Sequence, residues 1–279
     1  MSEAQARSVA IGTFDGVHRG HRRVIEAAQA SGLPTTVVTF DPHPRIALGN
    51  QVELLTTLER RLELLHELGV ETHVVPFTSD LALKTPEEFA DSVLRPLGAQ
   101  VVVAGANFRF GRGRSGDLDT LARLGFDVRP VPLVEGISST RIRQLLRAGE
   151  LEAAAGLLGR PPEVEGTVVS GDARGGTLGF PTANLAVPTD LIVPPYGIYA
   201  GKAGGHRAAI SIGVNPHYGG EERRVEVFLL DFEGDLYGQR LVVELWQRLR
   251  DEQAFGSEQE LIDQIARDVE ATRAAEPPV

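Results

Sequence analysis

Residues 7–21 read RSVAIGTFDGVHRGH, and this stretch decides the fold of the first half of the chain. A short apolar run leads into a turn with three glycines, and the helical pattern HRRVIEAAQA follows. His18 and His21 are therefore expected in a strand-to-helix turn. In a parallel sheet such turns stand at the carboxyl ends of the strands, where ligands bind, and the start of the helix attracts phosphate.

Four more apolar runs, most of them rich in valine, alternate with helical patterns through the first half. This alternation predicts an α/β domain with a doubly wound, Rossmann-like parallel sheet. The expected strands are 7–14, 35–40, 72–77, 99–108 and 127–134. The expected helices are 21–30, 58–69, 85–98 and 117–125, with one or two more over 138–160.

The pattern changes after the breaker GRPP at 159–162. Short strands separated by Gly, Pro, Asn and Asp predict a small antiparallel β-barrel. The expected strands are 163–172, 196–203, 206–214, 223–232 and 239–246. The stretch SEQELIDQIARDVEAT opens with the capping box Ser257-x-x-Glu260 and predicts a terminal helix. The sequence therefore predicts two domains, an α/β domain over 1–160 and a mainly β domain over 161–279.

Composition excludes several classes of function. The 279 residues carry a net charge of −10, and nearly all of the acidic excess follows Arg160, which opposes nucleic-acid binding. The absence of cysteine removes disulfides, thiolate metal sites and cysteine nucleophiles. No apolar run reaches the roughly 20 residues of a membrane span, so we expect a cytoplasmic protein without a membrane partner. The oligomeric state cannot be read from the sequence.

Each candidate site also has an ordinary structural interpretation. A histidine near a helix start is often a surface residue, and Asp15 with His18 and His21 is a weak candidate metal site, because zinc helices usually place histidines at i and i+4. Phe108 and Phe110 suit core packing as well as an aromatic ligand. The glycine-rich GDARGGTLG at 171–179 is either a hairpin loop or a backbone phosphate site.

The string GTFDGVHRGH resembles the HxGH motif of the nucleotidylyltransferase superfamily and the start of the bacterial bifunctional riboflavin kinase/FAD synthetases. The resemblance spans nearly the whole chain, with Gly176 and Tyr218 departing from the commonest family pattern. The further matching segments are TFDPHP at 39–44, GANFRFGRGRSGD at 105–117, ISSTRIRQLL at 137–146, GGTLGFPTANL at 175–185, SIGVNPHYGG at 211–220 and RRVEVFLLDFEGDLYG at 223–238.

This resemblance implies two activities that use ATP. Riboflavin is phosphorylated to FMN, and FMN is then adenylylated to FAD with release of pyrophosphate. It implies Mg²⁺ as cofactor, with riboflavin, FMN and ATP as small-molecule partners. The alternative is a single-activity nucleotidylyltransferase whose β-module binds flavin without catalysis.

The resemblance also implies roles for particular residues. His18 and His21 act on the ATP phosphates, and Glu226 is the general base of the kinase. Thr182 and Asn184 hold the metal; they are two residues apart, so they face the same side of an extended chain. The further ATP- or phosphate-binding residues are Gly12, Phe14, Gly20, Ser139, Thr140, Arg143, Gly175 and Gly179. The flavin-binding residues are Asp41, Asn107, Phe108 and Arg109.

Overall fold

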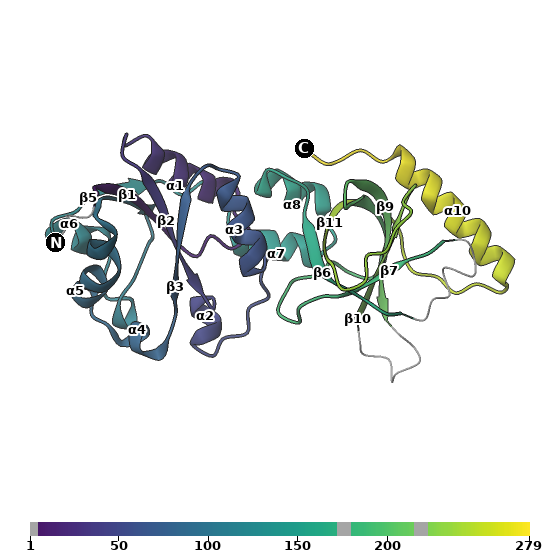
Figure 1. Cartoon of the computed structure of the whole chain (residues 1–279), viewed down its shortest axis with the longest axis horizontal. Coiled ribbons are helices and arrows are strands. Elements are labelled where there is room, and N and C mark those ends of the chain that lie inside the picture. Colours follow the sequence, from purple (N-terminus) through teal and green to yellow (C-terminus); the bar gives the residue numbers. More distant parts are fainter. Residues whose placement is uncertain (1–4, 172–179, 215–222) are drawn as a thin grey trace. The chain divides into compact units, whose positions relative to one another are not determined.

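The computed structural model describes residues 5–171, 180–214 and 223–279, and the chain divides into two compact units, Met1–Ser139 and Thr140–Val279. Figure 1 shows a sheet with helices in the first unit and a barrel in the second. The predicted fold class is confirmed. The predicted boundary after residue 160 concerns the two enzyme domains and stays a prediction.

The first unit is built on a parallel five-stranded sheet of order β3-β2-β1-β4-β5. Valine-rich strands with few exposed side chains suit the centre of such a sheet, because helices cover both of its faces. All four neighbouring pairs are parallel. The strands are β1 (Arg7–Ile11), β2 (Thr35–Asp41), β3 (Glu71–Pro76), β4 (Ala99–Gly105) and β5 (Asp127–Val131).

Helices follow the strands of this sheet. The predicted helix over 85–98 is divided into three short pieces: α5 (Pro86–Phe89), a π-helical turn (Ala90–Leu94) and a 3₁₀ turn (Arg95–Leu97). Thr85 and Glu88 form a reciprocal capping box at its start. The other helices are α1 (Arg19–Gln29), α2 (Pro44–Ala47), α3 (Leu58–His66), α4 (Ser79–Leu83) and α6 (Leu118–Arg123), with a 3₁₀ turn at Arg112–Arg114.

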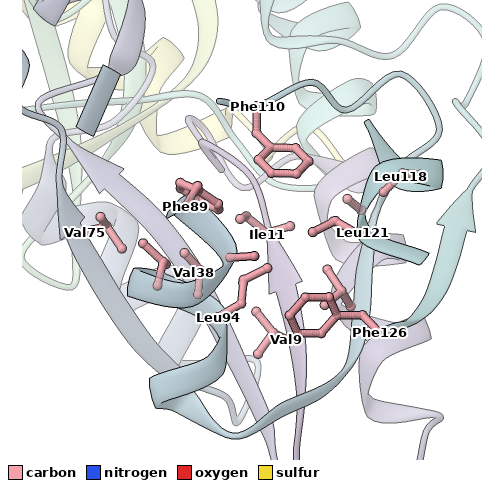
Figure 2. Packing of buried hydrophobic residues seen from close by; sticks show 14 of the residues in the cluster. Val9, Ile11, Val38, Val75, Phe89, Leu94, Phe110, Leu118, Leu121 and Phe126 are labelled. Atoms are coloured by element: carbon pink, nitrogen blue, oxygen red, sulfur yellow. The ribbon is translucent and has the colours of Figure 1, made fainter. Parts of the chain in front are cut away.

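Buried hydrophobic side chains fill the space between the sheet and its helices. In one cluster, shown in Figure 2, Val9 and Ile11 of β1 pack with Phe89 and Leu94, and Phe110 joins from a loop. A second cluster includes Phe14, Ile25 and Leu65. Burying each such side chain contributes about 1.5–3 kcal/mol, so these two clusters hold the strands in register.

The second unit begins with α7 (Ser139–Arg147) and α8 (Leu151–Leu158) and continues into a closed antiparallel barrel of order β10-β7-β6-β11-β8-β9. Strand β7 was not among the expected strands. The strands are β6 (Glu163–Val169), β7 (Ala183–Ala186), β8 (Gly197–Ala203), β9 (His206–Val214), β10 (Arg223–Leu229) and β11 (Arg240–Arg250).

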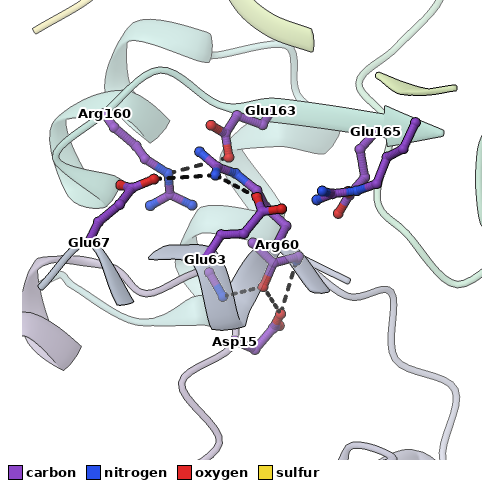
Figure 3. A network of polar contacts seen from close by, with 10 residues as sticks. Asp15, Arg60, Glu63, Glu67, Arg160, Glu163 and Glu165 are labelled. Atoms are coloured by element: carbon purple, nitrogen blue, oxygen red, sulfur yellow. Dashed lines mark hydrogen bonds and ion pairs between the residues drawn. The ribbon is translucent and has the colours of Figure 1, made fainter. Parts of the chain in front are cut away.

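Charged residues line the start of β6, as Figure 3 shows for Glu163 and Glu165. Glu163 lies 3.5 Å from Nε of Arg160. Glu165 is almost fully buried and binds Arg240 of β11, with its Oε2 2.6 Å from Nε. This pair joins two neighbouring strands of the barrel.

The predicted terminal helix is α10 (Glu258–Ala274), which contacts β8 and β9. Its main polar anchor is Asp268, whose carboxylate accepts from Nε and Nη2 of Arg250 at 2.7–3.1 Å. Arg207 donates to the carbonyl of Ala275 just after the helix and lies over the Trp246 ring. The helix is therefore held to the barrel mainly along its second half.

Candidate functional site

The two histidines of the opening stretch stack on one another. His18 caps α1, and its Nδ1 accepts the backbone N–H of His21 at 3.3 Å. The two ring centroids are 3.6 Å apart with an interplanar angle of 13°. The pair lies at the carboxyl edge of the sheet beside the point between β1 and β4 where the strand order reverses, which is where ligands bind in such sheets.

Small residues and one aromatic ring shape this turn. A Cβ at Gly20 would lie 3.2 Å from the His18 ring, and one at Gly12 would lie 3.3 Å from the Phe14 ring. Phe14 is buried, has a φ of 51°, and its ring centroid is 5.2 Å from that of His21. The two glycines thus leave room for the aromatic rings that define the turn.

A segment that sequence reasoning did not single out supports the turn from the other side. Asp15 is buried, and its Oδ1 accepts the backbone N–H groups of Leu55 and Thr56 at 2.9 and 3.2 Å. The hydroxyl of Thr56 accepts the N–H of Gly16 at 3.1 Å. The Asp15 carboxylate, which Figure 3 includes, therefore ties the turn to the chain that leads into α3.

The buried Arg61 of α3 was also missed. Its Nη1 donates to the carbonyl of Thr13 at 2.9 Å, and its Nη2 lies 3.8 Å from Oδ1 of Asp41. Burial lowers the pKa of this guanidinium, while the carboxylates of Asp15 and Asp41 act in the opposite direction. The available signal was helical spacing, because Arg61 shares the apolar face of α3 with Leu64 and Leu65.

The matching segment ISSTRIRQLL at 137–146 contains Ser139, the first residue of α7. The Ser139 hydroxyl donates to the carbonyl of Asp15 at 3.1 Å. This hydrogen bond joins Ser139 to residues 12–21, the segment that carries His18 and His21 and is called the histidine turn below. Thr140 and Arg143 follow on α7 and belong to the second compact unit. Arg143 is buried and Thr140 is exposed.

The predicted flavin-binding residues follow β2 and β4. Asp41 ends β2 with a half-exposed carboxylate. Asn107 and Arg109 are exposed just after β4, and Arg109 lies 3.5 Å from Oδ2 of Asp117. The ring of Phe108 is partly buried and stacks at 5.7 Å on Phe110, a member of the core. Phe110 is thus a packing residue, while Phe108 stands between the core and the surface.

On the barrel, Glu226 of β10 lies directly opposite Asn184 of β7 in the strand register. Residues in this relation have Cβ atoms about 5 Å apart. Glu226 alternates with the buried Val225 and Val227, so its side chain stands on the outer face. Oε1 of Glu226 is 3.1 Å from Nη1 of Arg224, on the same face. Two predicted kinase residues are thereby brought together from strands far apart in sequence.

The surroundings of Asn184 suit a metal ligand. Its Oδ1 is buried and makes no hydrogen bond within the described ranges, and a Cβ at Gly171 would collide with its amide. Phe180 packs edge-on at 5.5 Å against Phe228, two residues beyond Glu226. Gly175 and Gly179, like Gly176 and Tyr218, lie outside the described residues.

Other features bear on the type of protein. Within the residues that the structure describes, no group of three or more His, Cys, Asp or Glu side chains is arranged to hold a metal. Over 5–171, 180–214 and 223–279, no helix combines the length and the apolar character needed to cross a bilayer. A strand-to-helix turn at the carboxyl edge of a parallel sheet suits phosphate binding, and a carboxylate beside an amide on a barrel suits proton transfer and ligand binding. Together these two features fit a two-domain transferase that acts on nucleotides.

Comparison with known proteins identifies the family. A model described as FAD synthetase matches residues 1–143, and a model described as riboflavin kinase matches residues 158–275. The bifunctional riboflavin kinase/FMN adenylyltransferase of Listeria monocytogenes is 39% identical, over 95% of this chain and 91% of that protein. The protein of the same name from Bacillus subtilis is 38% identical, over 96% and 92%.

A solved structure has the same fold along the whole chain. It is described as a macrolide-efflux protein from Streptococcus pneumoniae, has a TM-score of 0.85 and 36% identity, and the match covers 96% of this chain and 94% of that one. The chain belongs to the family of bifunctional riboflavin kinase/FMN adenylyltransferases. It carries both transferase activities, and the single-activity alternative is not supported. Riboflavin, FMN, FAD and ATP are the corresponding substrates and products.

Proposed function

We propose that the two activities are carried out at two separate sites, one in each predicted enzyme domain, 1–160 and 161–279. The observation that carries this proposal is the pairing of Glu226 with Asn184 across two barrel strands, in a unit separate from the histidine turn. Each unit thus has its own set of groups suited to phosphate chemistry. We also propose a cytoplasmic location, which rests on the sequence alone.

In the kinase site, Glu226 is the general base that accepts the proton of the riboflavin 5′-hydroxyl. That hydroxyl is a weak nucleophile, so proton removal at the moment of attack speeds the reaction. Arg224 donates to Oε1 of Glu226 at 3.1 Å and so holds the carboxylate in place. The wall formed by Phe180 and Phe228 suits the apolar flavin ring.

Asn184 and Thr182 would hold Mg²⁺ in this site. Mg²⁺ prefers oxygen ligands and takes few from the protein, and the buried Oδ1 of Asn184 makes no hydrogen bond in the described part of the chain. When bound, the ion neutralises charge on the ATP phosphates. Gly175 and Gly179, which precede Thr182 in the sequence, are proposed to bind phosphate.

In the adenylyltransferase site, an FMN phosphate oxygen attacks the α-phosphorus of ATP, and the bond to pyrophosphate breaks. His18 and His21 stabilise the charge that develops on the phosphates, and Gly12, Phe14 and Gly20 shape the turn that holds these histidines. The phosphates are also bound by three residues of the segment 137–146, which are Ser139, Thr140 and Arg143. Asp41, Asn107, Phe108 and Arg109 bind the flavin.

A crossed pair of variants tests this two-site proposal. His21→Ala removes one phosphate-stabilising group and should lower FAD formation from FMN by about 10² to 10³-fold, with riboflavin phosphorylation unchanged. Glu226→Gln removes the base and should lower riboflavin phosphorylation by about 10² to 10⁴-fold, with FMN adenylylation unchanged. Flavins are separated by chromatography after incubation with ATP and Mg²⁺.

Each variant should keep one activity, and that retained activity shows that the site without the substitution is intact. Loss of both reactions in a variant that remains folded by circular dichroism would contradict separate sites. Omission of Mg²⁺ should stop riboflavin phosphorylation, and a kinase that runs at full rate with chelator present would contradict the metal assignment.

A further inference from the structure

Arg61 is a buried arginine next to the histidine turn. Its side chain is only 3% exposed, yet it reaches two segments at the carboxyl edge of the sheet. It donates to the Thr13 carbonyl at 2.9 Å and lies 3.8 Å from the carboxylate of Asp41. It therefore connects the end of β1, where the histidine turn starts, with the end of β2.

The Thr13 carbonyl is held from two sides. The hydroxyl of Thr39, on β2, donates to the same oxygen at 2.9 Å. The next residue, Phe14, has a φ of 51°, and Val17 has a φ of 39°, both unusual for residues other than glycine. Such conformations persist only where the surroundings hold them, so the contacts to Thr13 bear directly on where His18 stands.

A purely structural role does not account for an arginine here. The Nε of Arg61 is buried and makes no hydrogen bond within the described ranges, and a buried donor left unpaired is costly. Burying the charge also costs several kcal/mol, and an apolar side chain of the same size would avoid both costs. A guanidinium at this position is explained if its charge and its forked donors are needed to hold Thr13 and Asp41.

We propose that Arg61 is a positioning residue for adenylyl transfer, which holds the histidine turn through Thr13 and fixes it relative to Asp41. The proposal rests on the proposed function of that turn. Arg61 acts through these groups and does not itself touch the reacting phosphates. Its planar fork supplies two donors at a fixed spacing, which a lysine ammonium cannot reproduce.

The test compares Arg61→Met, Arg61→Lys and the parent enzyme in both reactions. A displacement of about 1 Å at a reacting centre can cost about 10²-fold, so Arg61→Met should lower kcat for FAD formation by about that factor. KM for ATP should change little, because the histidines act on charge that develops in the transition state. Arg61→Lys should recover part of the loss. Riboflavin phosphorylation should be unchanged in both variants.

The matched control is Arg129→Met, which removes a partly exposed arginine from β5 of the same unit and should leave both reactions at the parent rate. A chemical rescue adds a readout that altered packing alone would not produce. In Arg61→Ala, millimolar guanidinium ion should restore part of the lost kcat, while tetramethylammonium should not.

Three results would overturn the proposal: a folded Arg61→Met with full FAD formation, a rise in KM for ATP with kcat unchanged, or a full-rate Arg61→Lys. If Arg61→Met does not fold, the lysine variant and the guanidinium rescue decide the question, and failure of both to behave as expected rejects it. A parent enzyme that makes no FAD from FMN would instead contradict the proposed function itself.

Discussion

At the residue scale, Gly171 makes room for the proposed metal ligand. A Cβ at this position would collide with the amide of Asn184. Gly171→Ala should therefore displace Asn184 and lower riboflavin phosphorylation by about 10- to 100-fold at limiting Mg²⁺, the usual effect of disturbing a group that supports a metal ligand. FMN adenylylation should be unaffected. A Mg²⁺ titration of the kinase rate in both proteins measures the effect.

Gly156→Ala is the matched control for Gly171→Ala. Gly156 lies inside α8, where an added Cβ meets nothing within 4 Å. Replacing it should leave both reactions unchanged and raise stability by up to about 1 kcal/mol, because glycine is a poor helix former. An unchanged Mg²⁺ requirement in Gly171→Ala would show that Asn184 does not need this space.

Motif residues and supporting residues differ in how far the sequence predicts them. His18, His21 and Glu226 could be named from short motifs, because their chemistry is local. Arg61 has no such motif: its spacing to Leu64 and Leu65 places it on the apolar face of α3, but only the packing shows what its guanidinium contacts. The contacts of Asp15 with residues 55 and 56 link positions 40 apart, which no local pattern reveals.

At the element scale, a buried ion pair is the main polar anchor of α10. Asp268 and Arg250 have side chains only 8% and 19% exposed, and the pair is bidentate. Asp268→Asn removes one charge and leaves the other buried, so the free energy of unfolding should fall by about 3 kcal/mol. The double variant Arg250→Met/Asp268→Leu should recover most of that loss. Urea unfolding of the parent and the two variants measures the loss and its recovery.

Arg273→Gln is the contrasting variant on the same helix. Arg273 pairs with Asp231, but both side chains are largely exposed, so its loss should barely change stability. Arg273 holds the pKa of Asp231 below its ordinary value. Whatever this pair adds is present above about pH 4 and is lost as the pH falls through the lowered pKa. Equal losses from Asp268→Asn and Arg273→Gln would contradict a special role for the buried pair.

The elements themselves were predictable to different degrees. The valine-rich strands of the sheet and the capped helix α10 follow from composition and spacing. Strand β7 did not stand out, because its four residues ANLA show neither alternation nor β-branching, and only pairing with β6 and β10 makes it a strand. The helix expected over 85–98 broke into three pieces, with Pro96 in the last of them.

At the scale of the whole molecule, the order of strands could be predicted only as a class. Alternating strands and helices imply a parallel sheet, and a series of short strands implies a barrel. The meeting of Glu226 with Asn184 needs the antiparallel register of two strands about 40 residues apart. Such a register depends on side-chain packing around the closed barrel. The sequence therefore names the proposed kinase residues but does not show that they meet.

The two compact units lead to a prediction about fragments. The second unit begins at Thr140, and its helix α8 packs on β11 with buried side chains at Leu151 and Leu158. A fragment of residues 140–279 should fold and phosphorylate riboflavin at nearly the rate of the full chain, because Glu226 and Asn184 lie within it. The shorter fragment 161–279 holds the same pair but lacks α8. It should be less stable by about 3 kcal/mol or more, the burial free energy of two leucines.

Thermal unfolding and riboflavin kinase assays on both fragments measure this difference. Equal stability would place α8 outside the folding unit of the barrel and favour a domain that begins at residue 161. If the longer fragment folds but does not phosphorylate riboflavin, the first unit must contribute to the kinase reaction, and the two-site proposal fails. An active shorter fragment with a lower unfolding temperature is the expected result, because catalysis then depends on the barrel face and stability on the helix that covers β11.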